Sequence, residues 1–467
     1  MDFDTLRTTV RTTLCATSAA AALVVAIATT TTAVAAPPPP EPAYFVDPAK
    51  LPFDELPGQP SKRLWGVLDG AGYRIEVPAQ WSGKLVMWAH GYRGDPATDP
   101  AALELTVDNH PLRSYLLAKG YAWAASSYSR NAYDPSTGAI DTHALTKHFK
   151  RLVDKPSLVY ITGASMGGHV TGVVAERWPK TYAGAMPICG VLGDYELFDY
   201  FYDFNAAAQT LSGVGKTFPY AADYLTTTVP ATKAALGPAF PFELNTAGQN
   251  LAALTQLRSG GVRPLFEQGW LFWNAVAGDF LFGLGVGDGT LPRQEGFVLD
   301  NKNVVYQFDL DPALSPAESA FNATVQRVSP DRGARNRRGI RNVPPTTGDL
   351  EIPTVSLHTL GDLFVPFLME QEYARRVAAK GNAGNFVVRA TRDYGHCTFT
   401  PTELVQTFDA LVAWVEGGVK PAGDDILNPA AVADPAFGCT YTDKVSPRQL
   451  DVVPELAFLK PPSCPAN

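Results

Sequence analysis

The chain has 467 residues, of which 46% are hydrophobic and 18% charged, so it can bury a large core. It contains 40 Gly and 39 Pro residues that form no repeat, and this composition excludes collagen, coiled coils and disordered chains. The formal charge of −8 gives no basic excess for phosphate binding, so we expect no nucleic-acid partner.

The first segment has the features of a secretory signal peptide. Arg7 and Arg11 precede an apolar run over residues 14–27, and residues 33–35 (Ala-Val-Ala) supply the small side chains of a cleavage site. We therefore predict a signal peptide over residues 1–35 and a secreted protein. The apolar run is short and rich in Thr and Ala, so no stable membrane anchor is expected.

Export affects the interpretation of the cysteines. Besides Cys15 in the predicted signal peptide, the chain has Cys189, Cys397, Cys439 and Cys464. An even number in an oxidising compartment favours disulfides over metal ligation. Three pairings are possible and the sequence alone does not choose among them; we favour Cys439 with Cys464 and Cys189 with Cys397.

The next part of the chain predicts an α/β fold. Residues 36–64 are Pro-rich and indicate an extended N-terminal arm. Apolar, β-branched and aromatic runs then predict strands at 65–68, 73–77, 84–89, 121–127, 157–162, 183–188, 354–359 and 385–391. Helical spacing predicts helices at 111–119, 145–150, 167–178, 367–380 and 403–416. Such alternation is typical of a mostly parallel sheet with helices on both faces.

One long interruption divides this pattern. Residues 191–351 lack the strand–helix alternation and are rich in aromatic residues, so we predict that they form a large inserted lid. The α/β core then comprises residues 65–190 and 352–418. Residues 419–467 form a C-terminal tail that contains Pro and Cys.

The strongest local motif is G-x-S-x-G at residues 163–167, between a predicted strand and a predicted helix. In this setting a strained turn lifts the serine hydroxyl above the sheet, and the small flanking residues let strand and helix approach. We therefore predict that Ser165 is a catalytic nucleophile.

A nucleophilic serine needs a base and an acid. His396 lies in the loop after the last predicted strand, and Asp362 follows the strand before it. The chain order Ser165, Asp362, His396 is the one that accompanies this serine motif. His396 would take the serine proton, while Asp362 would orient the imidazole and stabilise its cation. Asp194 is the alternative acid, and chain order favours Asp362.

The oxyanion of such a reaction needs two donors. The backbone N–H of Met166 follows the nucleophile directly and supplies one. The strand at 84–89 is followed by His90-Gly91-Tyr92, and we assign the second donor to the N–H of Tyr92.

The other polar candidates receive no catalytic role. His358 and His169 are predicted to be structural. Four residues are predicted to lie at the surface: His110, His143, His148 and Asp393. No phosphate loop or zinc spacing is present in the sequence, so no cofactor, no metal and no protein partner are expected.

These motifs resemble the α/β-hydrolase superfamily, in particular its secreted bacterial esterase-like and prolyl-oligopeptidase-like members. The residues that carry the resemblance are His90-Gly91, Gly163–Gly168, Asp362 and Gly395-His396. The resemblance covers the predicted core and implies a serine hydrolase that forms an acyl-enzyme, with the lid shaping the substrate pocket.

A second likeness concerns Cys397, which directly follows His396. This arrangement is similar to tannases and feruloyl esterases, which also carry a cysteine directly before the nucleophile, where this chain has Ala164. We expect a secreted serine hydrolase of carboxylic esters, and apolar, aromatic or polymeric esters suit the large lid. The alternatives are an exopeptidase of the same fold and a non-catalytic binding protein.

Overall fold

The computed structural model describes residues 42–216, 218–285, 287–294, 296–335, 339–446, 448 and 454–464. The predicted signal peptide over residues 1–35 lies outside the described residues. In the described part of the chain, no helix is both long and apolar enough to cross a membrane.

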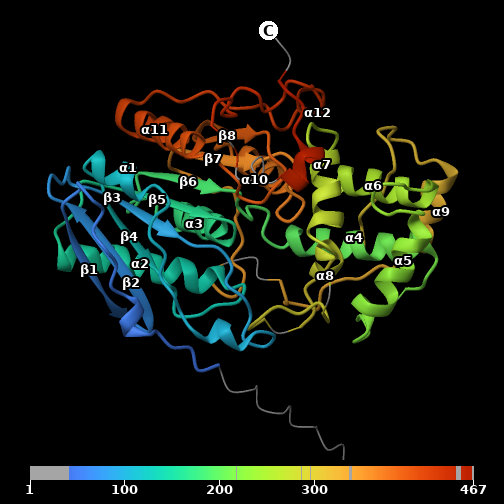
Figure 1. The fold of residues 1–467 in the computed structure, drawn as a ribbon, viewed down its shortest axis with the longest axis horizontal. Helices are drawn as coiled ribbons and strands as arrows, with labels where there is room; N and C mark the ends of the chain where they lie inside the picture. Colours follow the sequence, from blue (N-terminus) through green and yellow to red (C-terminus); the bar gives the residue numbers. More distant parts are fainter. Residues whose placement is uncertain are drawn as a thin grey trace, which may run out of the picture. The chain divides into compact units, whose positions relative to one another are not determined.

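An eight-stranded sheet forms the centre of the fold (Figure 1). Its strands are β1 Ser61–Leu68, β2 Ala71–Pro78, β3 Lys84–Ala89, β4 Ala122–Ser126, β5 Leu158–Ala164, β6 Gly184–Ile188, β7 Thr354–Thr359 and β8 Phe386–Thr391. They are ordered β1-β2-β4-β3-β5-β6-β7-β8, and only the pairs β1–β2 and β2–β4 are antiparallel. The predicted fold class is thereby confirmed.

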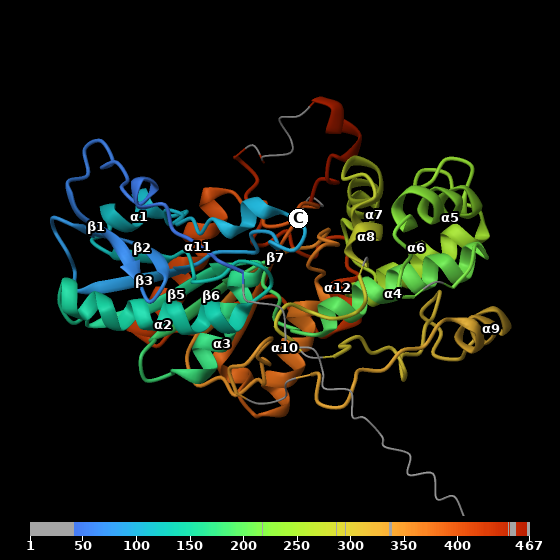
Figure 2. The same ribbon diagram turned by 90° about the horizontal axis from the view of Figure 1, so that it is seen from below.

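Helices cover both faces of this sheet (Figure 2). One layer contains α2 Pro135–Leu152, α3 Met166–Arg177 and α10 Leu368–Ala379, and the other contains α1 Arg113–Ala118 and α11 Pro401–Gly417. The inner strands β3, β6 and β7 are buried along nearly their whole length, as parallel strands between two helical layers must be, and β8 at one edge of the sheet is buried as well. The edge strand β1 alternates exposed and partly buried residues.

Two helix boundaries show how local sequence acts. α11 begins with a capping box: the Thr400 hydroxyl accepts the backbone N–H of Glu403, and the Glu403 carboxylate accepts the backbone N–H of Thr400. α2 begins ten residues before the predicted start at Leu145, so that prediction was wrong. Its first turns carry Ser, Thr and Gly, which are weak helix formers, but Asp134 caps them and they are buried in the fold.

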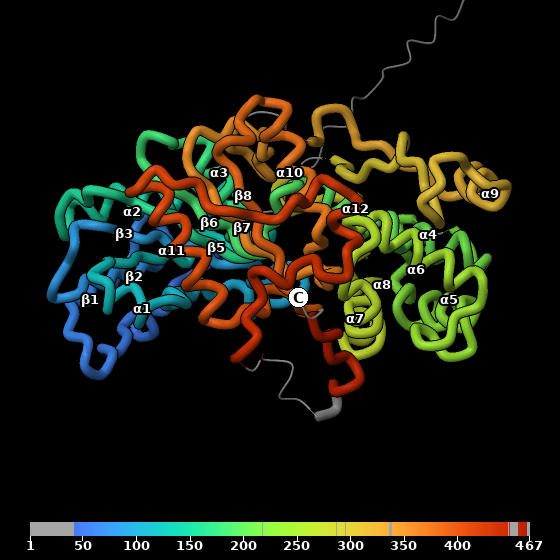
Figure 3. The backbone as a smooth tube through the Cα atoms, turned by 90° about the horizontal axis from the view of Figure 1, so that it is seen from above, coloured from blue at the N-terminus to red at the C-terminus, as the bar shows by residue number. Residues whose placement is uncertain are grey.

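The segment between β6 and β7, residues 191–351, is called the insertion below. Its helices are α4 Glu196–Ser212, α5 Val229–Leu236, α6 Thr246–Arg258, α7 Phe266–Leu271, α8 Phe280–Leu284 and α9 Pro316–Thr324. They gather beside the sheet rather than on either face, as Figure 3 also shows. Most of its buried aromatic side chains pack on one another and form a second core.

The remaining helical pieces are short. They are the 3₁₀ turns η1 Pro48–Lys50, η2 Pro100–Leu103, η5 Ala383–Asn385 and η6 Pro454–Leu459, the π-helical η3 Tyr224–Thr228 and η4 Phe272–Val276, and α12 Pro429–Val432.

Candidate active site

Ser165 occupies a strained turn between β5 and α3, with φ 60° and ψ −123°. Backbone approaches so closely here that a Cβ built on Gly163 would lie 2.3 Å from the carbonyl oxygen of Gly167. A Cβ on Gly167 would lie 2.0 Å from the carbonyl oxygen of Ala89. Both positions therefore require glycine, and the packing that they allow holds the serine in its strained conformation.

The structure brings Ser165, His396 and Asp362 together. Nε2 of His396 lies 2.9 Å from Oγ of Ser165, and Nδ1 lies 2.6 Å from Oδ2 of Asp362. The three residues follow β5, β8 and β7, which run parallel, so the carboxyl ends of these strands place them at one edge of the sheet.

The surroundings of Asp362 fix the direction of this chain of hydrogen bonds. The carboxylate is fully buried, and its Oδ1 accepts the backbone N–H groups of Phe364 at 2.8 Å and Val365 at 3.0 Å. Oδ2 is then left to accept a proton from Nδ1 of His396. In that tautomer Nε2 carries a lone pair and can accept the hydroxyl proton of Ser165.

The alternative acid, Asp194, has other partners. It is 5% exposed, forms an ion pair with Arg376, and accepts the backbone N–H of Thr346 at 3.2 Å. Asp194 therefore forms a buried ion pair at the start of the insertion. The carboxylate that contacts His396 is that of Asp362.

Three surface predictions were wrong. Asp393 is 1% exposed and pairs with Arg448 at 2.9 Å. His110 is buried with Nε2 2.9 Å from Oγ1 of Thr162, and burial lowers its pKa to about 3. His143 is also buried and stacks on a tryptophan ring, whereas His148 is partly exposed. His169 and His358, which were predicted to be structural, are fully buried. Packing between distant segments buries these groups, and the local sequence carries no signal of it.

Cys189, Cys397, Cys439 and Cys464 form two disulfides, Cys189–Cys397 and Cys439–Cys464, the pairing favoured from the sequence. Cys189 follows β6, which pairs with the strand of the nucleophile, and Cys397 follows His396. This bond ties the loop of the candidate base to the sheet beside Ser165. The described residues bring together one cluster of metal-ligand atoms, Cys189, His396 and Cys397, but disulfide sulfurs lack the thiolate that binds a metal.

The backbone at or next to each predicted oxyanion donor lies close to the serine. Met166 is the first residue of α3, so its backbone N–H has no acceptor within the helix. A Cβ built on Gly91 would lie 3.2 Å from Cβ of Ser165, which shows that the backbone before Tyr92 passes the nucleophile. The use of these N–H groups for an oxyanion remains a prediction.

The insertion contacts both loops that carry the acid and the base, which the sequence did not predict. Arg263 is buried and donates from Nε to the carbonyl oxygen of Leu360 at 2.7 Å. Trp273 donates from Nε1 to the carbonyl oxygen of Tyr394 at 3.0 Å. Burial lowers the pKa of Arg263 to about 10. The insertion is thus hydrogen-bonded to the two loops that carry Asp362 and His396.

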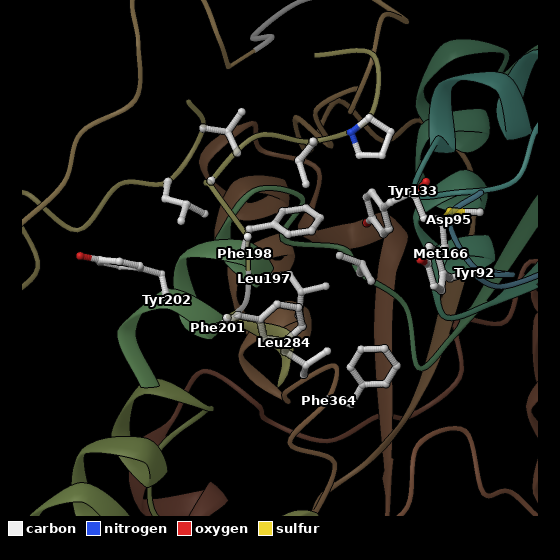
Figure 4. A pocket seen from close by; sticks show the side chains of 18 of the residues that line it. Tyr92, Asp95, Tyr133, Met166, Leu197, Phe198, Phe201, Tyr202, Leu284 and Phe364 are labelled. Atoms are coloured by element: carbon white, nitrogen blue, oxygen red, sulfur yellow. The ribbon is translucent and has the colours of Figure 1, made fainter. Parts of the chain in front are cut away.

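A cavity of about 330 Å³ opens beside Ser165 between the core and the insertion. Figure 4 shows its two sides: Tyr92, Asp95, Tyr133 and Met166 lie on one, and Leu197, Phe198, Phe201 and Leu284 of the insertion on the other. The walls are mainly apolar and aromatic. The cavity can therefore take an apolar group next to the nucleophile.

Comparison with known proteins gives distant relatives. The chain is 22% identical to an o-phthalyl amidase of Xanthobacter agilis over 419 residues, which cover 78% of this chain and 90% of that protein. It is 30% identical to an uncharacterised esterase of Agrobacterium fabrum over 135 residues, about a quarter (24%) of each chain. The solved structure of feruloyl esterase B from Aspergillus oryzae aligns with 79% of this chain and 85% of that one, at 14% identity and a TM-score of 0.37. No protein-family model matches the chain.

Proposed function

Because the chain has the fold of the α/β-hydrolase superfamily, we propose that it is a secreted serine hydrolase that cleaves carboxylic esters through an acyl-enzyme. The observation that carries this proposal is the continuous contact from Ser165 through His396 to Asp362. A hydroxyl, an imidazole and a buried carboxylate in this order can generate a nucleophile at neutral pH.

In the first half of the reaction, Oγ of Ser165 attacks the ester carbonyl carbon while Nε2 of His396 takes the hydroxyl proton. The tetrahedral oxyanion accepts hydrogen bonds from the backbone N–H groups of Met166 and Tyr92. The bond between the carbonyl carbon and the alcohol oxygen then breaks. His396 returns its proton to that oxygen, and the alcohol leaves.

In the second half, water replaces the alcohol. His396 removes a proton from the water, the hydroxide oxygen attacks the acyl carbon, and the bond to Oγ of Ser165 breaks with return of the proton to the serine. Asp362 stabilises the imidazolium in both halves. The products are a carboxylic acid and the free enzyme.

The acyl or aryl group of the substrate occupies the cavity between the core and the insertion. Its walls of Leu197, Phe198, Phe201 and Leu284 favour an apolar or aromatic group. The insertion acts as the lid of this site.

Amide hydrolysis is the second candidate, because the relative that matches most of this chain is an amidase. An amide uses the same serine, but its leaving nitrogen depends more on protonation by His396.

The proposal that the protein is secreted rests on the predicted signal peptide over residues 1–35 and on the two disulfides, which persist in oxidising compartments.

A substrate panel separates these candidates. We expect hydrolysis of 4-nitrophenyl butyrate and 4-nitrophenyl benzoate, with kcat/KM well above that for the matching 4-nitroanilides and for aminoacyl 4-nitroanilides. Ser165→Ala should abolish every activity of the panel. Faster cleavage of the anilides would support an amidase, and faster cleavage of the aminoacyl compounds an exopeptidase. No turnover of any compound would favour the non-catalytic binding protein.

A further inference from the structure

The cavity beside Ser165, called the acyl pocket here, has one acidic side chain and no basic one among its described lining residues. Among its described lining residues Asp95 has the only charged side chain, and no Lys, Arg or His lines it. Asp95 lies on the same side as Tyr92 and Met166 (Figure 4). Its Oδ1 accepts the backbone N–H of Ala97 at 2.9 Å, which holds the carboxylate in a turn, and no cation of the described residues forms an ion pair with it.

The hydroxyl of Tyr133 donates its proton away from the acyl pocket. Nε2 of His169 lies 2.7 Å from the carbonyl oxygen of Pro344, and a carbonyl can only accept, so Nε2 carries the proton. Nδ1 of the neutral ring is then an acceptor, and burial lowers the pKa of His169, which favours this neutral form. The Tyr133 hydroxyl, 2.9 Å from Nδ1, must therefore donate to it.

Two further hydroxyls of the lining donate to internal acceptors. Oγ1 of Thr290 donates to a carboxylate oxygen of Asp288 at 2.6 Å. The hydroxyl of Tyr202 donates to the carbonyl oxygen of Gln326 at 3.3 Å. These protons are thus already used within the protein and are not offered to a ligand.

The cation next to this lining in the sequence is also engaged. Arg293 follows the lining residue Pro292, and its guanidinium donates to Asp134 at 2.7 Å and to Thr137 at 3.2 Å. An anionic group in the acyl pocket would therefore meet the carboxylate of Asp95, apolar walls and hydroxyls that already donate within the protein. Among the described lining residues, the phenol of Tyr92 is the exception, and it is 46% exposed at the same side as Asp95. Transfer of a carboxylate from water to such surroundings without a partner is costly.

We propose that the acyl pocket selects substrates by charge: it takes an uncharged aryl or alkyl acyl group and rejects one that carries a carboxylate, with Asp95 as the specificity-determining residue. This inference rests on the proposed function. An amide-bearing acyl group is accepted, because its N–H groups can donate to the oxygens of Asp95 and Tyr133.

Two esters of equal shape test the inference. 4-nitrophenyl 3-carboxybenzoate and 4-nitrophenyl 3-carbamoylbenzoate differ by a carboxylate against a neutral amide. We expect kcat/KM for the carboxylate to be lower by about 100-fold, because an unpaired like charge is brought next to Asp95. Asp95→Asn keeps the oxygen that accepts the Ala97 N–H but removes the negative charge. It should reduce the ratio of kcat/KM for the carbamoyl ester to kcat/KM for the carboxy ester by about tenfold.

Asp99→Asn is the matched control. Asp99 lies in the same loop and accepts a backbone N–H in the same way, from Ala101 at 3.0 Å, but it does not line the acyl pocket. It should leave the ratio of the two esters unchanged. An equal change in both variants would show that overall charge, not Asp95, sets the preference, and would overturn the inference.

The outcomes distinguish the inference from the function on which it rests. Equal hydrolysis of the two benzoates by the unaltered enzyme would overturn the charge selection alone. Turnover of 4-nitrophenyl butyrate without turnover of either benzoate would likewise overturn only the inference. If none of the three esters is hydrolysed, the proposed function itself is overturned.

Discussion

At Asp362 the backbone decides which carboxylate oxygen faces the candidate base. The N–H groups of Phe364 and Val365 both bind Oδ1, and Oδ2 is left for Nδ1 of His396. A side chain that lacks the negative charge would still fit this site. It would lose the stabilisation of the imidazolium and could hold the ring in the wrong tautomer.

Asp362→Asn is therefore expected to lower kcat by about 10⁴-fold on 4-nitrophenyl butyrate, on the precedent of such triads. Asp194→Asn is the matched control, because it removes the other candidate carboxylate. It leaves Arg376 without its buried charge partner, so it should lower the melting temperature while kcat falls far less. Steady-state kinetics and thermal unfolding of both variants measure this. A larger loss of kcat in Asp194→Asn would contradict the assignment of the acid.

At this scale the sequence predicted the residues whose chemistry depends on local pattern. Ser165 lies in a motif that needs its own strand and helix, and His396 and Asp362 follow strands that are evident from their apolar runs. Asp393 and His110 were placed at the surface because their partners, Arg448 and Thr162, lie on segments that the local sequence does not connect to them.

Among the elements, the insertion is anchored to the loops of Asp362 and His396 through α7 and η4. Gly269 of α7 packs on the turn before Asp362, where a Cβ would lie 2.2 Å from the carbonyl oxygen of Gly361. Trp273 of η4 binds the carbonyl oxygen of Tyr394 in the loop of His396. Movement of this part of the insertion would displace both loops.

Two tryptophans of the insertion allow a matched test of this anchoring. Trp273→Phe removes the hydrogen bond to the loop of His396, and we expect kcat to fall roughly tenfold because small displacements of catalytic groups are costly. Trp270→Phe removes a similar bond, from Nε1 to the carbonyl oxygen of Pro241 at 3.2 Å within the insertion. It should lower only the melting temperature. Equal effects of the two variants on kcat would argue against anchoring.

The strands were predictable at this scale because each is a short apolar run between turn residues, and β3 and β7 have the predicted bounds. The start of α2 was not, since its first turns are helical only through the Asp134 cap and their packing. The contacts of Arg263 and Trp273 join segments about a hundred residues apart in the chain, and the hydrophobic periodicity of the sequence does not indicate such long-range contacts.

In the molecule as a whole, buried titratable groups couple folding to pH. Burial lowers the pKa of His90 to about 4, of His110 to about 3 and of His358 to about 4. The unfolded chain binds these protons below about pH 6.5 and the folded protein does not, so stability falls as the pH drops from there toward 4.

Burial raises the pKa of Glu370 to about 8, so the folded protein keeps a proton that the unfolded chain loses, and stability falls as the pH rises from 4.5 to 8.

Glu370→Gln tests the second effect. The amide imitates the protonated acid, so the variant should gain stability over the unaltered protein by about 1.4 kcal/mol for each pH unit between 4.5 and 8. Its melting temperature should exceed that of the unaltered protein at pH 8 and nearly equal it at pH 5. Glu372→Gln, on the same helix but paired with Arg375 and partly exposed, is the control and should show no such trend. A constant difference across the pH range would contradict the buried neutral acid.

The central claim is that Ser165 is an activated nucleophile, and its reaction with a fluorophosphonate probe tests this most directly. The account predicts that the probe labels the protein at Ser165 within minutes, that mass spectrometry of the digested protein finds the adduct on the peptide that contains this residue, and that Ser165→Ala and His396→Ala are not labelled. A folded protein that resists the probe, or that is labelled equally well as Ser165→Ala, would contradict it.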